Sequence, residues 1–367
     1  MIRIDEIYEN TFWAWLRQHR RGIRSYHCFP IGSSSPESVQ CHGTTQVWEH
    51  NYILFFDVEP IHLDRFRPTF EAVRYDFARD IHDRAEQPGI IITSEHDSQM
   101  VEQVCSMYGW SHRHYFFWGW AALDWYRGYN MTFLMPKPQD RKITRTFIAP
   151  NRIVGGARRH RVELLYWIFK QNLTNSWISC PATCPVEGTS ILDIVRPLTQ
   201  QYPDMVQVFE RQQLPMNFPG ETGHPMHSCW LSLFDQAAEC LVYLVSETVA
   251  TGRRHQLTEK IFKPICLQMP FVLHSTQGSL AYLRSYGLRT FDHLWDESYD
   301  LEPDDQLRTQ KIAQVLADLH SLSQPEQQQL AQAAQAVCEH NYDHFYSGAF
   351  EQRLWQEMTD LLESLPL

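Results

Sequence analysis

Short apolar runs alternate with helix-like segments in the second half of the chain, and this alternation constrains the fold more than any other feature of the sequence. Residues 241–245 and 270–274 are rich in β-branched and aromatic side chains, which is typical of fully buried strands. Residues 259–263 and 279–286 have the capping residues of short helices. Residues 288–291 are expected to form a third strand. The order strand, helix, strand, helix, strand predicts a parallel sheet covered by helices, an α/β fold.

The first half of the chain repeats this alternation with a different sequence. Residues 52–56 and 89–93 are apolar runs of strand length. Residues 98–108 have helical spacing that ends at Gly109, and the apolar run at 114–118 predicts another strand. A second parallel α/β unit is therefore expected.

The length of 367 residues favours two domains, each able to bury a core of its own. We expect an N-terminal α/β domain over residues 1–150 and a second α/β domain over residues 151–320. Residues 321–367 contain amphipathic patterns that predict C-terminal helices packing back onto the body of the protein.

Charge and cysteine content limit the classes of function. A net charge of −11 argues against general attraction to a nucleic-acid backbone, although a local basic face remains open. Nine cysteines, an odd number without framework spacing, indicate reduced thiols. The charged N-terminus and the absence of a long apolar run predict a soluble cytoplasmic protein without a membrane partner.

Polar residues follow the strand predicted at 241–245. In a parallel unit, ligands bind beyond the carboxyl ends of the strands, where helix N-termini accept phosphate. Glu247, Thr258, Glu259 and Lys260 would all lie at this edge. A carboxylate can hold ribose hydroxyls and a lysine can neutralise a diphosphate, so the group describes a nucleotide-diphosphate site. The alternative is that Glu259 forms an i,i+4 surface pair with Lys263 and that Glu247 is a solvated strand end.

A basic, glycine-containing segment precedes the helix predicted at 162–169. Basic side chains and exposed amides at a helix start make an anion site, whereas the alternative is a solvated linker between domains with a positive face. The segment contains Gly155, Gly156 and four arginines, Arg152, Arg158, Arg159 and Arg161.

Two segments, Tyr-Leu-Val-Ser-Glu-Thr at 243–248 and Leu-Thr-Glu-Lys-Ile-Phe-Lys-Pro at 257–264, together resemble the donor-binding signature of fucosyltransferase-type glycosyltransferases of the GT-B fold. In that family a Phe-Glu-Asn-Ser strand end is followed by Thr-Glu-Lys at the start of a helix. This chain keeps the Glu and the Thr-Glu-Lys, but it has Thr248 where Asn is usual. The continuation through Phe291 and Arg308 is similar to fucosyltransferase-like proteins encoded by bacteriophages. The resemblance covers roughly residues 85–345.

The resemblance implies a fold and a reaction. The fold would be GT-B-like, with two Rossmann-like domains facing across a cleft, an acceptor side in 1–150 and a donor side in 151–320. The reaction would move a sugar from a nucleotide-activated donor to a hydroxyl acceptor, with inversion and without a metal. The nucleotide-sugar would be a co-substrate and no cofactor is implied. A phage protein of this kind would act in the cytoplasm of the host cell.

The resemblance also assigns residues to the donor. Glu259 and Glu247 would contact ribose or sugar hydroxyls, with Thr248 and Thr258 beside them. Lys260 would contact the diphosphate, whose negative charge grows as the glycosidic bond breaks. An arginine near the helix at 162–169 would do the same. By position this is Arg161, with Arg158 as the alternative.

An inverting reaction needs a group that takes the proton of the acceptor. Glu95 and His96 follow the strand predicted at 89–93 and are the candidates, with Asp57 and Glu59 behind them. The acceptor would be a glycan or other carbohydrate, which the net negative charge favours, or a hydroxymethylated pyrimidine in phage DNA. The DNA acceptor is kept open by the arginines near 151–161 and by three more near the N-terminus, Arg20, Arg21 and Arg24.

Other classes of function remain open. The chain could be a non-catalytic α/β protein that binds a nucleotide or a partner, since Thr248 departs from the family pattern, or a DNA-binding protein without transferase activity. A zinc site is conceivable near the middle of the chain, but the spacing fits no standard ligand pattern, and no metal is predicted. Its residues would be Cys180, Cys184, His224, His227 and Cys229.

Overall fold

The structure is a computed structural model, and it shows an α/β fold with two sheets in which parallel pairing dominates. The residues that it describes are 14–18, 24–28, 39–43, 52–56, 60–80, 89–128, 141–218 and 233–365. The α/β class predicted from the sequence is confirmed.

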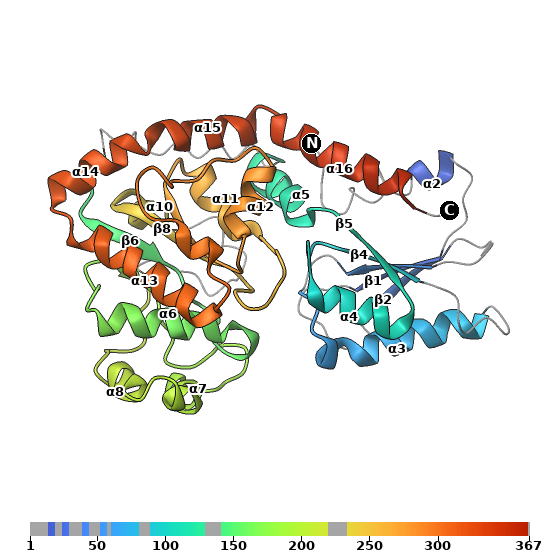
Figure 1. Ribbon diagram of the computed structural model, residues 1–367, viewed down its shortest axis with the longest axis horizontal. Coiled ribbons are helices and arrows are strands. Elements are labelled where there is room, and N and C mark those ends of the chain that lie inside the picture. Colours follow the sequence, from blue (N-terminus) through green and yellow to red (C-terminus); the bar gives the residue numbers. More distant parts are fainter. Residues whose placement is uncertain are drawn as a thin grey trace. The chain divides into compact units, whose positions relative to one another are not determined.

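The chain divides into two compact units, each of which contains one sheet (Figure 1). The first unit consists of 1–129, 253–256 and 351–367, and the second of 130–252 and 257–350. Four residues from the middle of the chain, Arg253 to Gln256, thus belong to the first unit. The boundary that we expected at residue 150 falls just after a strand of the second sheet.

The first unit has a five-stranded sheet in the order β2-β1-β3-β4-β5. Strands β1, β3, β4 and β5 run parallel, whereas β2 pairs antiparallel with β1. Ile53 lies beside Ile90 and Leu54 beside Ile91, so the two apolar runs recognised in the sequence are neighbours. The strands are β1 Arg24–Cys28, β2 Val39–Gly43, β3 Tyr52–Phe56, β4 Gly89–Thr93 and β5 Ser111–His114.

Two helices connect the parallel strands of this sheet. Helix α3 (Leu63–Asp80) joins β3 to β4, and α4 (Gln99–Tyr108) joins β4 to β5. Helix α4 begins at Ser98, whose hydroxyl accepts the Val101 N–H, and it ends at Gly109 in the left-handed conformation. The core beneath these helices is aromatic, and Phe56 packs edge-on against Phe66. The remaining helices are α2 Ala14–Gln18, α5 Phe117–Ala122, the π-helix η3 Leu123–Gly128 and most of α16 Ala349–Glu363.

The prediction of a strand at 114–118 was wrong. Strand β5 ends at His114, and the aromatic run continues as α5. A short continuous apolar run is compatible with either a buried strand or a buried helix, so packing decides between them. Here Trp120 packs edge-on against Trp355 of α16, with ring centroids 4.7 Å apart.

The second unit has a four-stranded sheet in the order β7-β6-β8-β9, with every neighbouring pair parallel. All residues of β8 are buried, which explains its continuous apolar sequence. The strands are β6 Arg145–Ala149, β7 Trp177–Ile178, β8 Cys240–Ser246 and β9 Phe271–His274.

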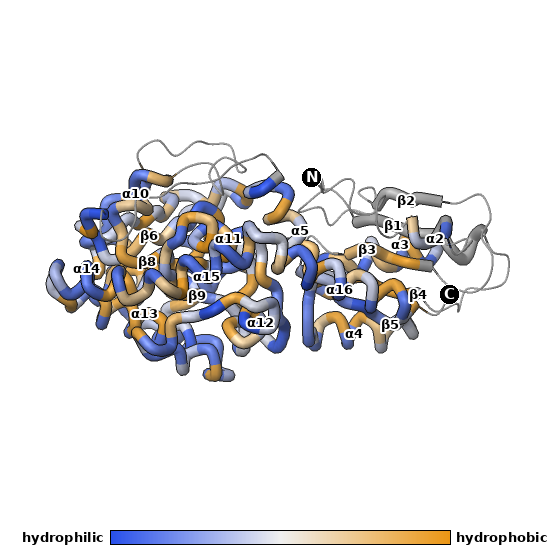
Figure 2. The backbone as a smooth tube through the Cα atoms, turned by 90° about the horizontal axis from the view of Figure 1, so that it is seen from above, coloured by the Kyte–Doolittle hydropathy of each residue, from blue (hydrophilic) through white to orange (hydrophobic). Residues whose placement is uncertain are grey.

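Helices surround this sheet (Figure 1). Helix α6 follows β6, α11 lies between β8 and β9, and α13 packs against α6 and the sheet. In Figure 2 the glutamine-rich α14 is mostly hydrophilic, as expected of a helix with one exposed face. The longer helices are α6 Arg159–Lys170, α11 Glu259–Cys266, α12 Ser279–Ser285, α13 Asp305–Ser321, α14 Gln324–Ala333 and α15 Gln335–Tyr346. The shorter ones are η4 Gly156–Arg158, α7 Ile191–Val195, η5 Arg196–Gln200, α8 Met205–Glu210, α10 Phe234–Ala238 and η6 Ser298–Leu301.

The strand expected at 288–291 does not form. The backbone N–H and carbonyl of Arg289 are bonded by the Asn341 side chain at 2.7 and 2.9 Å, and the Phe291 N–H donates to the Glu297 carboxylate at 2.8 Å. Side chains therefore satisfy backbone groups that a sheet would otherwise have paired.

No helix in the described part of the chain is both long and apolar enough to cross a membrane.

Candidate functional site

The second sheet has a topological switch point between β6 and β8. The chain passes from β6 to β7 on one side and later to β8 on the other, so the loops that follow β6 and β8 lead away from each other. In open parallel sheets, ligands bind at this point, outside the carboxyl ends of the strands. Ala149 ends β6 and Ser246 ends β8, so the candidate site is built from the residues that follow them.

Glu247 begins the loop after β8 and is fully buried. Its two carboxylate oxygens accept the Thr258 N–H at 3.1 Å and the Thr258 hydroxyl at 2.5 Å. Burial raises the pKa of Glu247, and nearby Lys260 partly offsets this rise. The prediction of a solvated strand end is therefore wrong, and Glu247 instead fixes the start of α11 to the end of β8.

Lys260 joins three of the predicted residues. Its ammonium group lies 2.9 Å from the Thr258 hydroxyl, 2.9 Å from a Glu259 carboxylate oxygen and 3.2 Å from the Thr248 hydroxyl. About a quarter of the Lys260 side chain, 26%, is exposed. Although burial opposes ionisation of Glu259, Lys260 holds the pKa of that carboxyl below its usual value. We call Glu247, Thr248, Thr258, Glu259 and Lys260, which the sequence predicts to bind a donor, the donor-site cluster.

The alternative of a surface pair between Glu259 and Lys263 is wrong, because both side chains are buried. Lys263 is buried, and its ammonium lies 5.6 Å from the centre of the Phe234 ring. Glu259 pairs with Lys260, and both belong to the first turn of α11.

Arg161 ties the two sides of the switch point together. Its buried guanidinium donates to the carbonyl oxygens of Ile153 at 2.9 Å, Ser246 at 3.0 Å and Glu247 at 3.2 Å. These contacts give Arg161 a structural task in the loop after β6 and at the end of β8. Arg158 is partly buried, and its guanidinium forms no hydrogen bond or ion pair with the described residues, so it is the more available cation for a diphosphate.

The glycine pair before α6 faces a carboxylate of the chain itself. A Cβ added to Gly155 or to Gly156 would collide with the Glu187 carboxylate, and Gly156 has a positive φ of 56°. Only residues without a side chain permit this approach. No local pattern indicates this approach, because Glu187 is more than 30 positions away in a loop of ordinary composition.

The thiol of Cys184 lies beneath the same glycines. A Cβ at Gly155 would stand 3.1 Å from its sulfur. Burial would raise the pKa of Cys184, but backbone N–H groups of Val154, Gly155, Val186 and Glu187 lower it below its usual value. Two amides of the loop after β6 are therefore directed at a sulfur atom, which reduces the number available to an outside anion.

Two buried histidines lie behind the cluster and were not singled out from the sequence. His160 Nε2 lies 3.0 Å from the Glu247 carbonyl oxygen, and its ring packs edge-on against His274. His274 Nε2 in turn lies 3.1 Å from the Thr309 hydroxyl. Burial, with a smaller effect of Arg161, lowers the pKa of His160 to about 3, so the imidazole is neutral at physiological pH.

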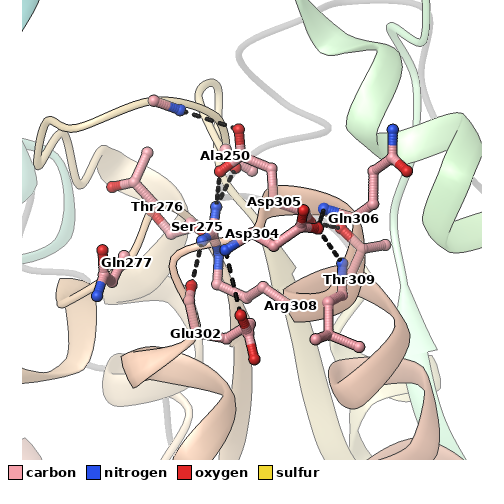
Figure 3. Close-up of polar contacts among 12 residues, drawn as sticks. Ala250, Ser275, Thr276, Gln277, Glu302, Asp304, Asp305, Gln306, Arg308 and Thr309 are labelled. Carbon is pink, nitrogen blue, oxygen red and sulfur yellow. Dashed lines mark hydrogen bonds and ion pairs between the residues drawn. The ribbon is translucent and has the colours of Figure 1, made fainter.

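Arg308 fixes the loops that follow β8 and β9 (Figure 3). Its guanidinium donates to the carbonyl oxygens of Ala250 at 2.7 Å, Ser275 at 3.0 Å and Glu302 at 2.7 Å. It also pairs with Asp305, whose other carboxylate oxygen accepts the Gly252 N–H at 3.1 Å. Arg308, which is part of the resemblance to phage proteins, therefore makes many structural contacts.

In the first unit, Glu95 is enclosed. Its carboxylate accepts the Ile61 N–H and the Ser98 hydroxyl, and it lies 3.6 Å from an Arg254 nitrogen. Burial raises the pKa of Glu95, while Arg254 acts in the opposite direction. The contacts occupy both oxygens, so they favour a structural use of the carboxylate in holding Arg254.

His96, the other candidate base, is exposed. Its ring stacks on His255 at 5.7 Å and meets His114 edge-on at 5.1 Å. Loss of solvent around the ring, followed by the nearby His114, lowers the pKa of His96. His114 also lies 3.2 Å from a Glu357 carboxylate oxygen. Residues far apart in sequence thus form a histidine group that sequence reasoning missed.

Several other predicted residues cannot be placed. Asp57, Glu59, Arg20 and Arg21 lie outside the described residues, and Arg24 lies in β1. Among the residues that the structure describes, no group of three or more histidine, cysteine or acidic residues could hold a metal ion. Cys180 and Cys184 are buried free thiols. The other three residues of the conceivable zinc site, His224, His227 and Cys229, lie outside the described ranges.

No family model, curated protein or solved structure matches this chain. The assignment of a function therefore depends on the geometry of the switch point and on the chemistry of the residues gathered there.

Proposed function

We propose that the chain is a glycosyltransferase that binds a nucleotide-activated sugar at the carboxyl edge of the second sheet. The observation that carries the proposal is the donor-site cluster, in which Lys260 lies between the carboxylate of Glu259 and the Thr258 hydroxyl, itself bonded to Glu247. A partly exposed ammonium group at a helix start is suited to a diphosphate. The neighbouring carboxylate can accept hydrogen bonds from ribose or sugar hydroxyls.

In the proposed reaction the acceptor oxygen attacks the anomeric carbon, and the bond between that carbon and the diphosphate oxygen breaks. Lys260 and Arg158 neutralise the charge that grows on the leaving diphosphate. Arg161 positions the loop after β6, and it does so through Ile153. The reaction inverts the anomeric carbon, needs no metal, and takes place in a GT-B arrangement of the two units.

His96 is the better of the two candidate bases. It is exposed, and its lowered pKa keeps the imidazole in the neutral form that accepts a proton. Glu95 remains a prediction, but its enclosed carboxylate makes it the weaker candidate. The acceptor would be a carbohydrate or a hydroxymethylated pyrimidine in DNA.

A second candidate is a protein that binds a nucleotide or a partner without catalysis. The observations that favour it are the carboxylate of Glu187 against Gly155 and Gly156, and the commitment of Arg161 to backbone carbonyls. Both reduce the positive potential that a catalytic diphosphate site requires. This candidate predicts saturable nucleotide binding without transfer of the sugar to any acceptor.

The test is a thermal-shift and calorimetric screen against UDP-, GDP-, ADP- and CMP-linked sugars, with and without a chelator. We expect one nucleotide class to raise the Tm in a chelator-independent way. Lys260→Ala should weaken that ligand by about tenfold or more. The matched control is Lys142→Ala, which changes an exposed lysine of the same unit and should leave binding unchanged. Equal binding by the wild type and Lys260→Ala would exclude the cluster as the donor site.

Catalysis is tested separately with the nucleotide that binds. Release of nucleoside diphosphate is measured with carbohydrate acceptors and with DNA containing hydroxymethylated pyrimidine. We expect His96→Ala to abolish turnover while donor affinity stays within about twofold. Binding without turnover on any acceptor would favour the non-catalytic candidate.

A further inference from the structure

Arg141 is a buried cation at the edge of the second sheet opposite to the donor-site cluster, and it has no partner in the part of the chain that the structure describes. It lies four positions before the start of β6, whereas the cluster follows the end of β8. Only 5% of the residue is exposed. Its three guanidinium nitrogens, Nε, Nη1 and Nη2, are buried, and none of them has a hydrogen-bond partner among the described residues.

No charged group among the described residues compensates for Arg141. The groups that act on it electrostatically are the buried thiols of Cys240, the first residue of β8, and Cys338, in the first turn of α15. Burial raises the pKa of Cys338 to about 12 and raises the pKa of Cys240 still further, so both thiols are neutral. The carboxylate of Glu239, next to Cys240, is directed toward Arg145 at 3.8 Å and Trp177 at 3.2 Å.

The backbone beside Arg141 is fixed. The Ile143 N–H donates to Gln328 at 3.4 Å, and the Gln324 amide donates to the Ile143 carbonyl oxygen at 3.0 Å. Both glutamines belong to α14. Arg141 is therefore attached two residues from a segment held by two side chains.

Burial of an unpaired guanidinium is strongly unfavourable, and an arginine cannot relieve it by losing its proton under ordinary conditions. A counter-anion relieves it. The guanidinium offers five N–H donors in one plane, which match the oxygens of a carboxylate, phosphate or sulfate ion.

We propose that Arg141 binds a small oxyanion of the phosphate or sulfate class between β8 and the start of α15. The neutral thiols of Cys240 and Cys338 lie near Arg141, and the Cys240 thiol donates to the Gln236 carbonyl oxygen at 3.1 Å, so the donors for the anion are those of the guanidinium. The bound anion stabilises the second unit and is separate from the nucleotide that we propose for the opposite edge of the sheet.

The experiment measures thermal unfolding while inorganic phosphate is raised at constant ionic strength, with chloride as the balancing ion. We expect the Tm of the wild type to rise with phosphate as single-site linkage requires. Arg141→Met should remove this dependence and should be at least as stable as the wild type without phosphate, because no unpaired charge is then buried. Arg141→Lys should weaken the apparent phosphate affinity by about tenfold or more, because it keeps the charge but loses the planar fork.

Two control variants separate this site from others. Arg211→Met changes an exposed arginine of the same unit and should keep the phosphate dependence. Lys260→Ala should also keep it, whereas loss of the dependence in Lys260→Ala would place the phosphate in the donor-site cluster and overturn the proposal. A wild-type Tm that does not respond to phosphate or sulfate would overturn it as well. If Arg141→Met does not fold, calorimetric titration of the wild type and of Arg141→Lys with phosphate decides the question.

Discussion

Replacing Thr258 by valine tests whether the donor-site cluster is one hydrogen-bonded unit. The Thr258 hydroxyl donates to the buried Glu247 carboxylate at 2.5 Å and accepts from the Lys260 ammonium at 2.9 Å. Valine keeps the β-branched shape and the backbone N–H that also bonds Glu247, but it removes both hydroxyl contacts. The perturbation is therefore confined to one oxygen atom between the Glu247 carboxylate and the Lys260 ammonium group.

The expected cost follows from the charges at both ends of this contact. Hydrogen bonds to charged groups contribute roughly 1.5–3 kcal/mol, and a buried carboxylate that loses a donor is left incompletely solvated. Glu247 is fully buried, so water cannot replace the hydroxyl. We expect the free energy of unfolding of the second unit to fall by roughly 2–3 kcal/mol. In a domain of this size, such a fall lowers the Tm by roughly 4–12 °C.

The assay is urea unfolding and calorimetry of the wild type, Thr258→Val and Thr258→Ser. The serine variant restores the hydroxyl and should recover most of the lost stability. Binding of the nucleotide-sugar should follow the same order, because Lys260 loses one of the groups that orient it. A valine variant as stable as the wild type would refute the view that Glu247, Thr258 and Lys260 act together.

Three further predictions concern the same edge of the sheet. The pKa of His160 is lowered to about 3, so the neutral ring contributes stability that is present above pH 6.5 and is lost as the pH falls from 6.5 to 3. The full loss over this range is on the order of 5 kcal/mol. Urea unfolding from pH 7 to pH 4 should therefore show a flatter dependence of stability on pH in His160→Gln than in the wild type. Glu187→Gln should raise the affinity for a nucleoside diphosphate by about tenfold, because a competing carboxylate is removed from Gly155 and Gly156; unchanged affinity in titration calorimetry would show that this carboxylate does not compete. Arg158→Ala should weaken the affinity for a nucleoside diphosphate by about tenfold with little change in Tm. Arg161→Ala should instead lower the free energy of unfolding by roughly 3 kcal/mol or more, since three backbone carbonyl oxygens lose their donor.

The sequence predicted the strands that are apolar along their whole length. Strands β8 and β9 are buried throughout, so their composition alone indicates them, and Thr258 correctly predicted the start of α11. The run at 114–118 failed because aromatic residues fill a helix core as readily as a strand. Residues 288–291 failed because their backbone is bonded by side chains of Asn341 and Glu297 that lie elsewhere in the sequence.

The candidate site was predictable where its residues are close in sequence. Glu247 and the Thr258 to Lys260 turn lie at a strand end and a helix start, which topology brings to the same edge. The contacts of Arg161 with carbonyls, the approach of Glu187 to the glycines and the burial of Arg141 have no local pattern. Each depends on tertiary packing between segments that are not neighbours in sequence.

The passage of Arg253 to Gln256 into the first unit has a consequence for the modularity of the protein. Arg254 is the cation next to the enclosed carboxylate of Glu95, yet it is supplied by a loop that leaves the second unit after Gly252 and returns to it at Leu257. A fragment that ends at residue 129 would keep Glu95 and lose its cation. Neither unit is therefore encoded by one uninterrupted stretch of the sequence, and neither could be exchanged by moving a single segment of the gene.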